Sequence, residues 1–450
     1  MTIAFVIRNC AAASLIAILL TACSDDKPSE TTSTGDPESL PNTNQPSPAK
    51  REPTSPGLLE ARQGFTTQFR PTSYQADGAA TEPPPELFRL VKYTSPAGEL
   101  AAYLTPDPQD GIRHPAVLWC HGGFGGIGSW FWEDITRQND QSARAFREAG
   151  IVVMCPSWRG ENDNPGKYEQ FFGEVNDLLA ARDFLTSLPY VDPQRIYLAG
   201  HSTGGTMTLL GVCATDKFRA AFSFGGDAVY LPRTYPFSPF DTTSAEEVRL
   251  RSALNFVSGI RTRTFYFEGE SSAHCAGALQ MERLAQTHGT PFRACIIREA
   301  DHFNILAPLT EYVAQQILAD TGSTCQIEIT NSDANIVFRD AWERYRTARA
   351  AAAAKFPVIE LTAAAHEHVR RIAQHESLDL HASFLRVGAS KGWKLEFDDT
   401  FNAETDVKIE QMGVSIVVAK SEIEHVQGHM IDYVQRGDRD GFIFVDRVTE

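Results

Sequence analysis

The sequence predicts an α/β fold built on a mostly parallel β-sheet. From Leu87 onward, short apolar runs alternate with longer amphipathic segments, which is the pattern of parallel strands joined by crossover helices. Of the 450 residues, 42% are hydrophobic and 22% are charged, so most of the chain can bury a core. Collagen-like and wholly disordered chains are therefore excluded, and the length favours more than one domain.

Apolar runs and amphipathic segments give the expected order of elements. The runs at residues 87–91 and 100–104 predict an opening antiparallel pair of strands. Further strands are expected at residues 116–120, 151–155, 195–199, 220–224, 264–267 and 292–297, and helices at residues 174–188, 207–214, 275–288 and 305–320. Residues 229–258 are longer than a simple connection, and we expect either a cap over a pocket or a surface insertion.

Residues 200–204 have the sequence Gly-His-Ser-Thr-Gly and stand between the strand at 195–199 and the next helix. A strand–turn–helix with this pattern is typical of a nucleophile elbow, in which glycines relieve the crowding of a sharp turn and the serine hydroxyl projects clear of the sheet. The sequence therefore predicts Ser202 as a nucleophile, and His201 beside it as a structural residue.

A serine nucleophile requires a base and hydrogen-bond donors for a developing oxyanion. His302 follows the strand at 292–297 and is the predicted base. The predicted oxyanion donors are the backbone N–H groups of Thr203, next to the nucleophile, and of Gly123 and Phe124, in the glycine-rich loop after the strand at 116–120.

Residues 85–322 resemble the α/β-hydrolase superfamily, in particular its prolyl oligopeptidase and dienelactone hydrolase-like branches. The matching motifs are His-Gly-Gly at 121–123, Pro-Ser-Trp-Arg-Gly at 156–160, Val-Asp-Pro-Gln-Arg-Ile at 191–196, the elbow at 200–204 and Asp-His-Phe at 301–303. The resemblance implies the α/β-hydrolase fold, with a mostly parallel eight-stranded sheet and helices on both faces. It also implies a Ser/acid/His triad and the hydrolysis of ester or amide bonds.

The triad acid is where the sequence departs from the family pattern. The family usually places an aspartate three residues after a glycine at the end of the strand before the histidine strand, and here Ser272 stands there. We favour Glu270, in the same loop, as the acid. The alternatives are Asp227 after the preceding strand, Glu268 at the end of its own strand, and no working acid.

The N-terminal residues predict export. Residues 1–22 contain one charge, Arg8, and an apolar run that is too short to span a bilayer, as in a signal peptide. The sequence Leu-Thr-Ala-Cys at 20–23 resembles the lipobox of bacterial lipoproteins, which implies lipidation of Cys23. Residues 23–60 are rich in proline, serine and threonine and predict a disordered tether. We therefore expect an extracytoplasmic protein of the cell envelope, lipid-anchored to a membrane.

The C-terminal part predicts a helical connector, residues 334–356, and a second domain. Residues 357–446 resemble the A-type (HesB-like) iron–sulfur carrier domain, which implies a small β-rich fold. The matching segments stand in the family's order at 359–365, 385–387, 395–399, 413–418, 431–434 and 441–444. That family binds iron through cysteines, and no cysteine follows Cys325. The pair His425 and His429 has no third ligand that spacing identifies, so we expect no metal and no cofactor.

Charge and motifs together leave two functions. The formal net charge is −16, with 41 basic against 57 acidic residues, which argues against a nucleic-acid partner. We favour a membrane-anchored, extracytoplasmic serine hydrolase that cleaves small ester or peptide substrates through an acyl-enzyme. The alternative is a catalytically silent hydrolase-fold scaffold or binding protein, because both domains depart from their families at ligand or catalytic positions. The sequence names no protein partner for the second domain.

Overall fold

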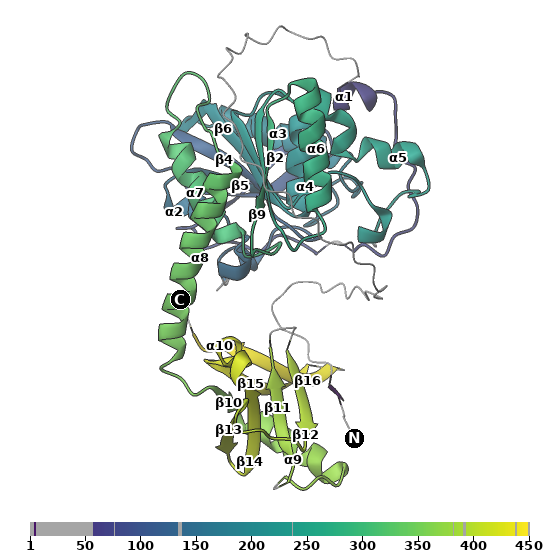
Figure 1. The fold of residues 1–450 in the computed structure, drawn as a ribbon. Coiled ribbons are helices and arrows are strands. Elements are labelled where there is room, and N and C mark those ends of the chain that lie inside the picture. The colour runs from purple at the N-terminus through teal and green to yellow at the C-terminus, as the bar shows by residue number, and fades with distance from the viewer. Residues whose placement is uncertain are drawn as a thin grey trace, which may run out of the picture. The chain divides into compact units, whose positions relative to one another are not determined.

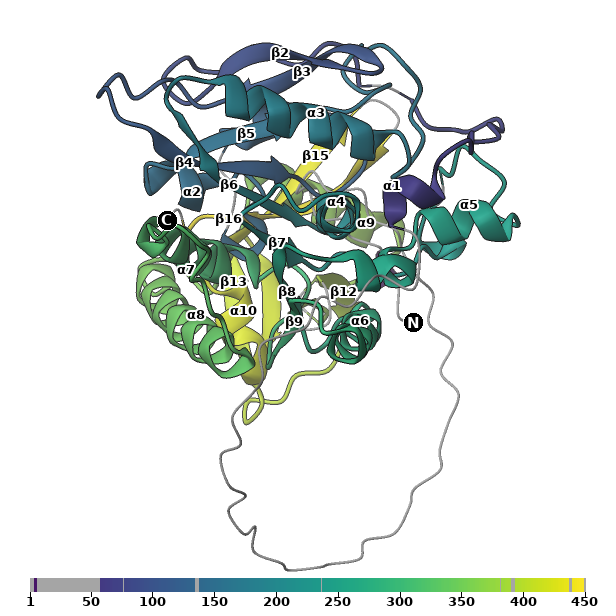
Figure 2. The same ribbon diagram turned by 90° about the horizontal axis from the view of Figure 1, so that it is seen from above.

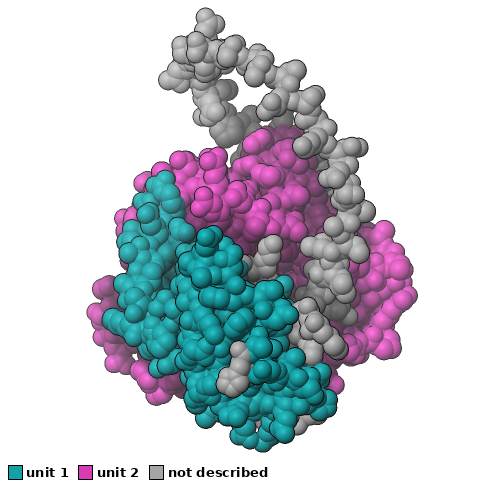
Figure 3. Space-filling model, turned by 60° about the horizontal axis from the view of Figure 1, so that its bottom comes forward, with its two compact units in different colours: residues 1–14, 339–450 teal, residues 15–338 magenta. Residues whose placement is uncertain are grey.

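The computed structural model describes residues 4–5, 57–75, 77–133, 137–235, 237–380, 382–389, 393–436 and 439–448. Apart from residues 4–5 and 57–60, the predicted signal peptide, Cys23 and the predicted tether lie outside the described residues. The chain divides into two compact units (Figure 3). The first unit in chain order, Leu15–Phe338, is unit 2 in the key of Figure 3, and the second, Met1–Ser14 with Arg339–Glu450, is unit 1. Within the part of the chain that the structure describes, no helix combines the length and the apolar character that crossing a membrane requires.

An eight-stranded sheet forms the centre of the Leu15–Phe338 unit (Figure 1, Figure 2). Its strands are β2 (Arg89–Ser95), β3 (Gly98–Leu104), β4 (His114–Cys120), β5 (Val152–Pro156), β6 (Val191–His201), β7 (Ala220–Phe224), β8 (Arg263–Gly269) and β9 (Phe292–Ile297). The order across the sheet is β2-β3-β5-β4-β6-β7-β8-β9. The β2–β3 and β3–β5 pairs are antiparallel and all later pairs are parallel, which confirms the predicted α/β-hydrolase fold.

Helices cover both faces of this sheet. Helices α3, α4 and α6 lie on one face, and α2 and α7 lie on the other (Figure 1). The described helices are α1 (Leu58–Ala61), α2 (Arg144–Glu148), α3 (Glu174–Ser187), α4 (Thr203–Ala214), α5 (Ala245–Leu250), α6 (Cys275–His288) and α7 (Leu306–Ala319), with 3-10 turns η1 (Ser129–Phe131), η2 (Arg137–Asn139), η3 (Pro232–Thr234) and η4 (Ala253–Gly259). Helix α4 is buried on every side except at its ends, because it packs between the sheet and η4.

The long segment 229–258 contributes to the hydrophobic core. Tyr230 and Tyr235 are buried and their rings stack with centroids 4.7 Å apart. The ring of Tyr235 also packs edge-on against Phe124, with centroids 6.2 Å apart. Part of the segment is therefore buried in the core, and one of its buried rings contacts the glycine-rich loop after β4.

One buried ion pair fixes the end of α7 to the middle of the sheet. Asp320 accepts hydrogen bonds from the Tyr197 hydroxyl of β6 (2.8 Å), from Arg219 Nε (2.6 Å) and from the backbone N–H of Gln326 (3.0 Å). Burial alone would raise the pKa of this carboxyl, but the hydrogen bonds and the charge of Arg219 bring it well below its usual value.

Replacing Asp320 by asparagine is expected to lower the free energy of unfolding by about 3 kcal/mol, because it leaves the buried Arg219 guanidinium without a counter-charge. Urea unfolding at pH 7 measures the change. The exposed substitution Asp183→Asn is the matched control and should change stability by less than about 0.5 kcal/mol. The difference between wild type and Asp320→Asn should shrink as the pH falls, because a lowered native pKa contributes stability only while the carboxyl is ionised. Equal unfolding free energies at pH 7 would contradict the assignment.

The second unit is β-rich, as predicted. Its two sheets have the orders β1-β12-β11-β14-β13 and β10-β15-β16. The strands are β1 (Ala4–Phe5), β10 (Ile359–Leu361), β11 (Phe384–Gly388), β12 (Lys394–Asp398), β13 (Asp406–Gln411), β14 (Val414–Ala419), β15 (His429–Arg436) and β16 (Arg439–Asp446); the helices are α8 (Asn331–Ala353), which begins in the first unit, α9 (Ala363–His375) and α10 (Ile423–Val426), with the 3-10 turn η5 (Lys420–Glu422). Helix α9 buries Ala365, Val369 and Ala373, spaced by four residues, on one face, and the Thr362 hydroxyl caps its first turn. The resemblance to the carrier family remains a prediction.

Candidate active site

Ser202 lies in a strained turn between β6 and α4. Its backbone has φ 54° and ψ −116°, a conformation that residues other than glycine rarely adopt. The turn is sharp enough that a Cβ atom on Gly204 would lie 1.9 Å from the carbonyl oxygen of Cys120. The Ser202 N–H donates to the carbonyl of Phe224 (2.8 Å), which ties the turn to the end of β7. This geometry matches the predicted nucleophile elbow.

The glycine-rich loop after β4 lies against this turn. The Thr203 hydroxyl donates to the carbonyl of Gly123 (2.7 Å). The loop is also held by the Gly122 N–H, which donates to Gln141 Oε1 (2.6 Å), and by the Ile127 N–H, which donates to Asn162 Oδ1 (2.7 Å). The structure thus brings together the three predicted oxyanion residues around one pocket, since Gly123, Phe124 and Thr203 all line it.

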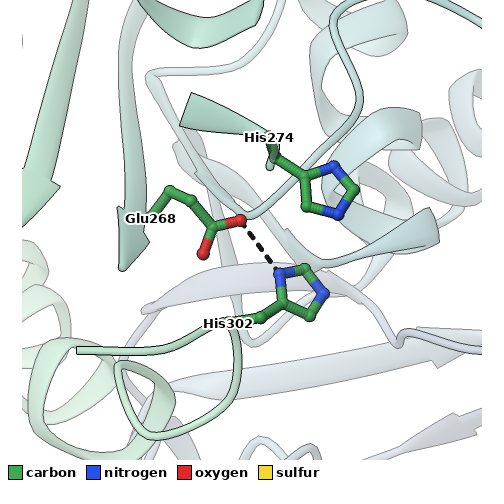
Figure 4. A group of neighbouring side chains, drawn as sticks. All are labelled: Glu268, His274 and His302. Carbon is green, nitrogen blue, oxygen red and sulfur yellow. Dashed lines mark hydrogen bonds and ion pairs between the residues drawn. The ribbon is translucent and has the colours of Figure 1, made fainter. Parts of the chain in front are cut away.

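His302 is paired with Glu268 (Figure 4). Glu268 Oε2 lies 2.9 Å from His302 Nδ1, and Glu268 Oε1 accepts from the Gly269 N–H (2.8 Å). The Glu268 side chain is fully buried, while 16% of the His302 side chain is exposed. A carboxylate on Nδ1 holds the imidazole in the tautomer that leaves Nε2 free to accept a proton.

Gly225 makes room for this pair. A Cβ atom on Gly225 would lie 2.5 Å from His302 Cε1 and 2.8 Å from Glu268 Oε2, and its φ of +66° also disfavours a side chain. A residue with a side chain would therefore not fit at position 225, where His302 and Glu268 meet.

The structure does not bring Glu270, the acid that we favoured, to His302. Glu270 is exposed, and its Oε1 accepts from the backbone N–H of Glu299 (2.7 Å). The reason lies in the path of the histidine loop, which crosses so close to the strand end that a Cβ atom on Gly269 would lie 2.4 Å from the Ala300 carbonyl oxygen. His302 therefore stands over the strand residue Glu268, and Glu270 is already beyond the crossing.

The alternative acid, Asp227, pairs with another histidine. Asp227 Oδ1 lies 2.7 Å from His274 Nδ1, and Asp227 Oδ2 accepts from the Tyr235 hydroxyl (2.6 Å). Burial opposes ionisation of His274, but the hydrogen bond to Asp227 raises its pKa above the usual value. The sequence suggests an exposed His274, whereas its ring stacks on His302 with centroids 4.9 Å apart.

Glu268, His274 and His302 each offer one ligand atom within 4.8 Å of the others, which is a geometry that a divalent cation could use. Within this group, Glu268 and His302 already bond to each other.

Ser202 and His302 meet at the same edge of the sheet. His201, next to the serine, has Nε2 2.9 Å from the carbonyl oxygen of His302, and burial lowers its pKa well below the usual value, so its ring is neutral. Among the described residues no hydrogen bond joins Ser202 Oγ to His302; such bonds often tighten only when substrate binds. Together with Glu268, these residues form a Ser/His/acid arrangement at the carboxyl ends of β6, β8 and β9.

The family model of the prolyl oligopeptidase family matches residues 137–318. Dipeptidyl-peptidase 5 of Porphyromonas gingivalis is 28% identical over 228 residues, which are 46% of this chain and 32% of that protein. The chain thus spans about a third of the length of this curated relative. These matches support a hydrolase function of the serine peptidase kind, in agreement with the geometry.

Solved structures that match about half of the chain include a peptidase and an esterase. The dipeptidyl peptidase 4 of Porphyromonas gingivalis is 22% identical, with a TM-score of 0.42, and the match covers 52% of this chain and 35% of that one. A hyperthermophilic esterase of Pyrobaculum calidifontis is 17% identical, with a TM-score of 0.41, and the match covers 52% of this chain and 86% of that one.

Proposed function

We propose that the protein is a serine hydrolase that cleaves ester or peptide bonds of small substrates through an acyl-enzyme. The observation that carries the proposal is the Glu268–His302 pair, 2.9 Å apart, beside the strained Ser202 turn. A silent scaffold has no need of a buried carboxylate that fixes a histidine tautomer, or of a glycine that makes room for the pair.

The reaction follows from the position of each group. His302 Nε2 accepts the proton of Ser202 Oγ as the oxygen bonds to the substrate's carbonyl carbon. The backbone N–H groups of Thr203 and of Gly123 or Phe124 donate to the oxyanion of the tetrahedral intermediate. His302 then gives its proton to the leaving oxygen or nitrogen as the bond to the leaving group breaks. In the second stage, His302 accepts a proton from water as the water oxygen bonds to the acyl carbon. His302 then returns the proton to Ser202 Oγ as the acyl-enzyme bond breaks.

A fluorophosphonate probe tests the proposal. Wild-type protein without residues 1–22 is expected to react at one site, and mass spectrometry of the digested protein should locate the adduct on the peptide that contains Ser202. Heat-denatured protein is the control and should remain unlabelled. A well-folded wild type that does not react would refute the hydrolase proposal and favour the catalytically silent scaffold.

The Thr203 hydroxyl is expected to support catalysis by holding the oxyanion loop through its hydrogen bond to Gly123. Replacing Thr203 by valine should lower kcat for a small nitrophenyl ester about three- to tenfold, the effect of losing one ordinary hydrogen bond. Thr203→Ser retains the hydroxyl and should stay within about twofold of wild type. Equal kcat values for Thr203→Val and wild type would show that the bond does not position the loop.

We propose further that the protein is exported and anchored to a membrane of the cell envelope through a lipid on Cys23. The support is the lipobox-like sequence at 20–23, followed by the proline- and serine-rich stretch. Cells fed a radiolabelled fatty acid should label the wild-type protein and not Cys23→Ala. Equal labelling of both proteins would refute the anchor.

For the second unit, we propose a carrier-like domain that has lost its metal ligands. The support is the ordered set of six short segments and the lack of cysteine after Cys325. Purified protein supplied with iron and sulfide should show no cluster absorbance; a cluster bound in this unit would overturn the proposal.

A further inference from the structure

A pocket opens beside the nucleophile, between the oxyanion loop, the start of α4 and the segment between β5 and α3. It is open to solvent, and the space in and directly above it is about 350 Å³. Its lining includes Gly123, Thr203 and Met207 on the catalytic side. Because His302 protonates the leaving group, the leaving group lies on the histidine side of Ser202, and no residue of the histidine loop lines the pocket. The pocket therefore receives the acyl part of the substrate.

Two buried carboxyl groups line this pocket, Glu161 and Glu174. Their residues are 3% and 1% exposed. Glu174 Oε1 accepts from the backbone N–H groups of Glu169 (2.6 Å) and Gln170 (3.1 Å), whereas its Oε2 is buried and has no hydrogen-bond partner. Glu161 Oε2 accepts from the Trp158 N–H (3.1 Å). A buried carboxylate oxygen without a donor is costly, so the free Oε2 marks a place for one.

The cations around the pocket are engaged elsewhere. Arg159 binds Asp177 (2.8 Å) and Glu169 (2.7 Å). Arg251 pairs with Glu247, and Arg62 donates to backbone carbonyls, among them that of Phe172 (2.8 Å). Among the described residues, no ion pair reaches Glu161 or Glu174.

The formal charges around the pocket show that Glu161 and Glu174 lack full counter-charges. Arg159 with its two acids carries −1, Arg251 with Glu247 carries 0, and Arg62, whose charge acts on Glu174, carries +1. With Glu161 and Glu174 ionised, the whole group therefore keeps a charge of −2. Burial is the main cause that raises the pKa of Glu174 to about 7 and the pKa of Glu161 well above its usual value. A positive ligand would stabilise the ionised form of both.

His121 Nε2 is a second buried acceptor at the pocket without a hydrogen-bond partner. His121 lines the pocket, and its Nδ1 lies 2.9 Å from the carbonyl oxygen of Gly122, so Nδ1 must carry the ring proton. Burial lowers the pKa of His121, which keeps the ring neutral and makes Nε2 an acceptor. This Nε2 is buried and has no hydrogen-bond partner. Among the residues that line the pocket, Glu174 Oε2 and His121 Nε2 are thus two buried acceptors without a donor.

We propose that this pocket binds a positively charged nitrogen group on the acyl part of the substrate, with Glu174 and Glu161 as its counter-charges and His121 Nε2 as a further acceptor. The aromatic rings of Trp158, Tyr168 and Phe171 complete the lining and suit a cation, because ring faces attract positive charge. The inference rests on the proposed hydrolase function and specifies its substrate class: amino or guanidino acyl esters and amides. The cation is either a basic side chain or a free α-ammonium group.

Three nitrophenyl esters separate these cases at pH 8, where Glu174 is ionised. N-acetyl-lysine ester carries a side-chain cation, norleucine ester carries only the α-ammonium group, and N-acetyl-norleucine ester carries neither. We expect at least a tenfold higher kcat/KM for one of the two cationic esters than for the neutral ester, and the favoured ester identifies the source of the cation. Glu174→Gln should reduce this preference at least fivefold. The exposed substitution Glu60→Gln is the matched control and should retain the wild-type preference.

The outcomes separate the inference from the proposed function. Turnover of all three esters at similar rates, or an unchanged preference in Glu174→Gln, would overturn the cation pocket and leave the hydrolase intact. Should Glu174→Gln fail to fold, Glu161→Gln takes its place with the same expectation. If no ester is cleaved and Ser202 is unlabelled, the hydrolase proposal fails. Calorimetry with n-butylammonium then decides on the pocket alone: binding to wild type that Glu161→Gln weakens would support it, and no binding would refute it.

Discussion

Replacing Ser202 by alanine is expected to lower kcat for a small nitrophenyl ester by about 10⁴-fold or more and to abolish labelling by fluorophosphonate. The hydroxyl is the atom that forms the acyl-enzyme, and no other group at the turn can replace it. Stability should change little, because alanine keeps the Cβ atom and therefore the same backbone strain at φ 54°.

Ser187→Ala is a suitable control for Ser202→Ala, since Ser187 is exposed at the end of α3. Thermal unfolding of the three proteins should coincide within about 2 °C. Retained labelling of Ser202→Ala would place the nucleophile at another residue and contradict the assignment of the elbow.

Replacing Glu268 by glutamine is expected to lower kcat by about 10²- to 10⁴-fold. The Glu268 carboxylate accepts the Nδ1 proton of His302, and it is the buried partner of that ring. The glutamine amide would donate to Nδ1 instead, which favours the tautomer with the proton on Nε2. In that tautomer Nε2 cannot accept the proton of Ser202.

Two other carboxylates serve as controls for Glu268→Gln. Glu270→Gln should stay within about twofold of wild type, because Glu270 bonds to a backbone N–H at the surface. Asp227→Asn should cost less than tenfold, because it acts on His302 only through the stacked ring of His274. Comparing kcat and the rate of fluorophosphonate labelling across the three variants identifies the acid, and a collapse in Glu270→Gln or Asp227→Asn alone would reject Glu268.

The buried strands were predictable because both their faces pack against helices. A central parallel strand is then a continuous apolar run, and the predicted run at 220–224 coincides with β7. By contrast, the start of β6 was missed. Its first residues, Val191-Asp192-Pro193-Gln194, have the composition of a turn, and the register of β4 against β6 shifts between His114 and Ala116 at this point.

The places of Ser202, His302 and the glycine-rich loop were predictable because each is tied to the end of a strand by a local motif. The acid was not, because a spacing rule counts residues and does not show where another loop crosses the chain. His274 was missed for the same reason: its partner Asp227 is 47 residues away in the sequence. A usable sequence signal was the glutamate inside the apolar strand Thr-Phe-Tyr-Phe-Glu-Gly, since such a position is buried and rarely holds an unpartnered charge.

Glu268, the proposed acid, lies within β8 rather than in the loop that follows it, and this position determines which parts of the site can change. Loops after strands vary in length and sequence more readily than the strands themselves. With Glu268 in the hydrogen-bonded part of the sheet, insertions or exchanges beyond Gly269 can reshape the rim of the site while the carboxylate keeps its place. Exchanges between Glu270 and Ser272 that retain the bonds of Glu270 and Ser271 to the histidine loop can accordingly give new specificities without rebuilding the proton-transfer pair.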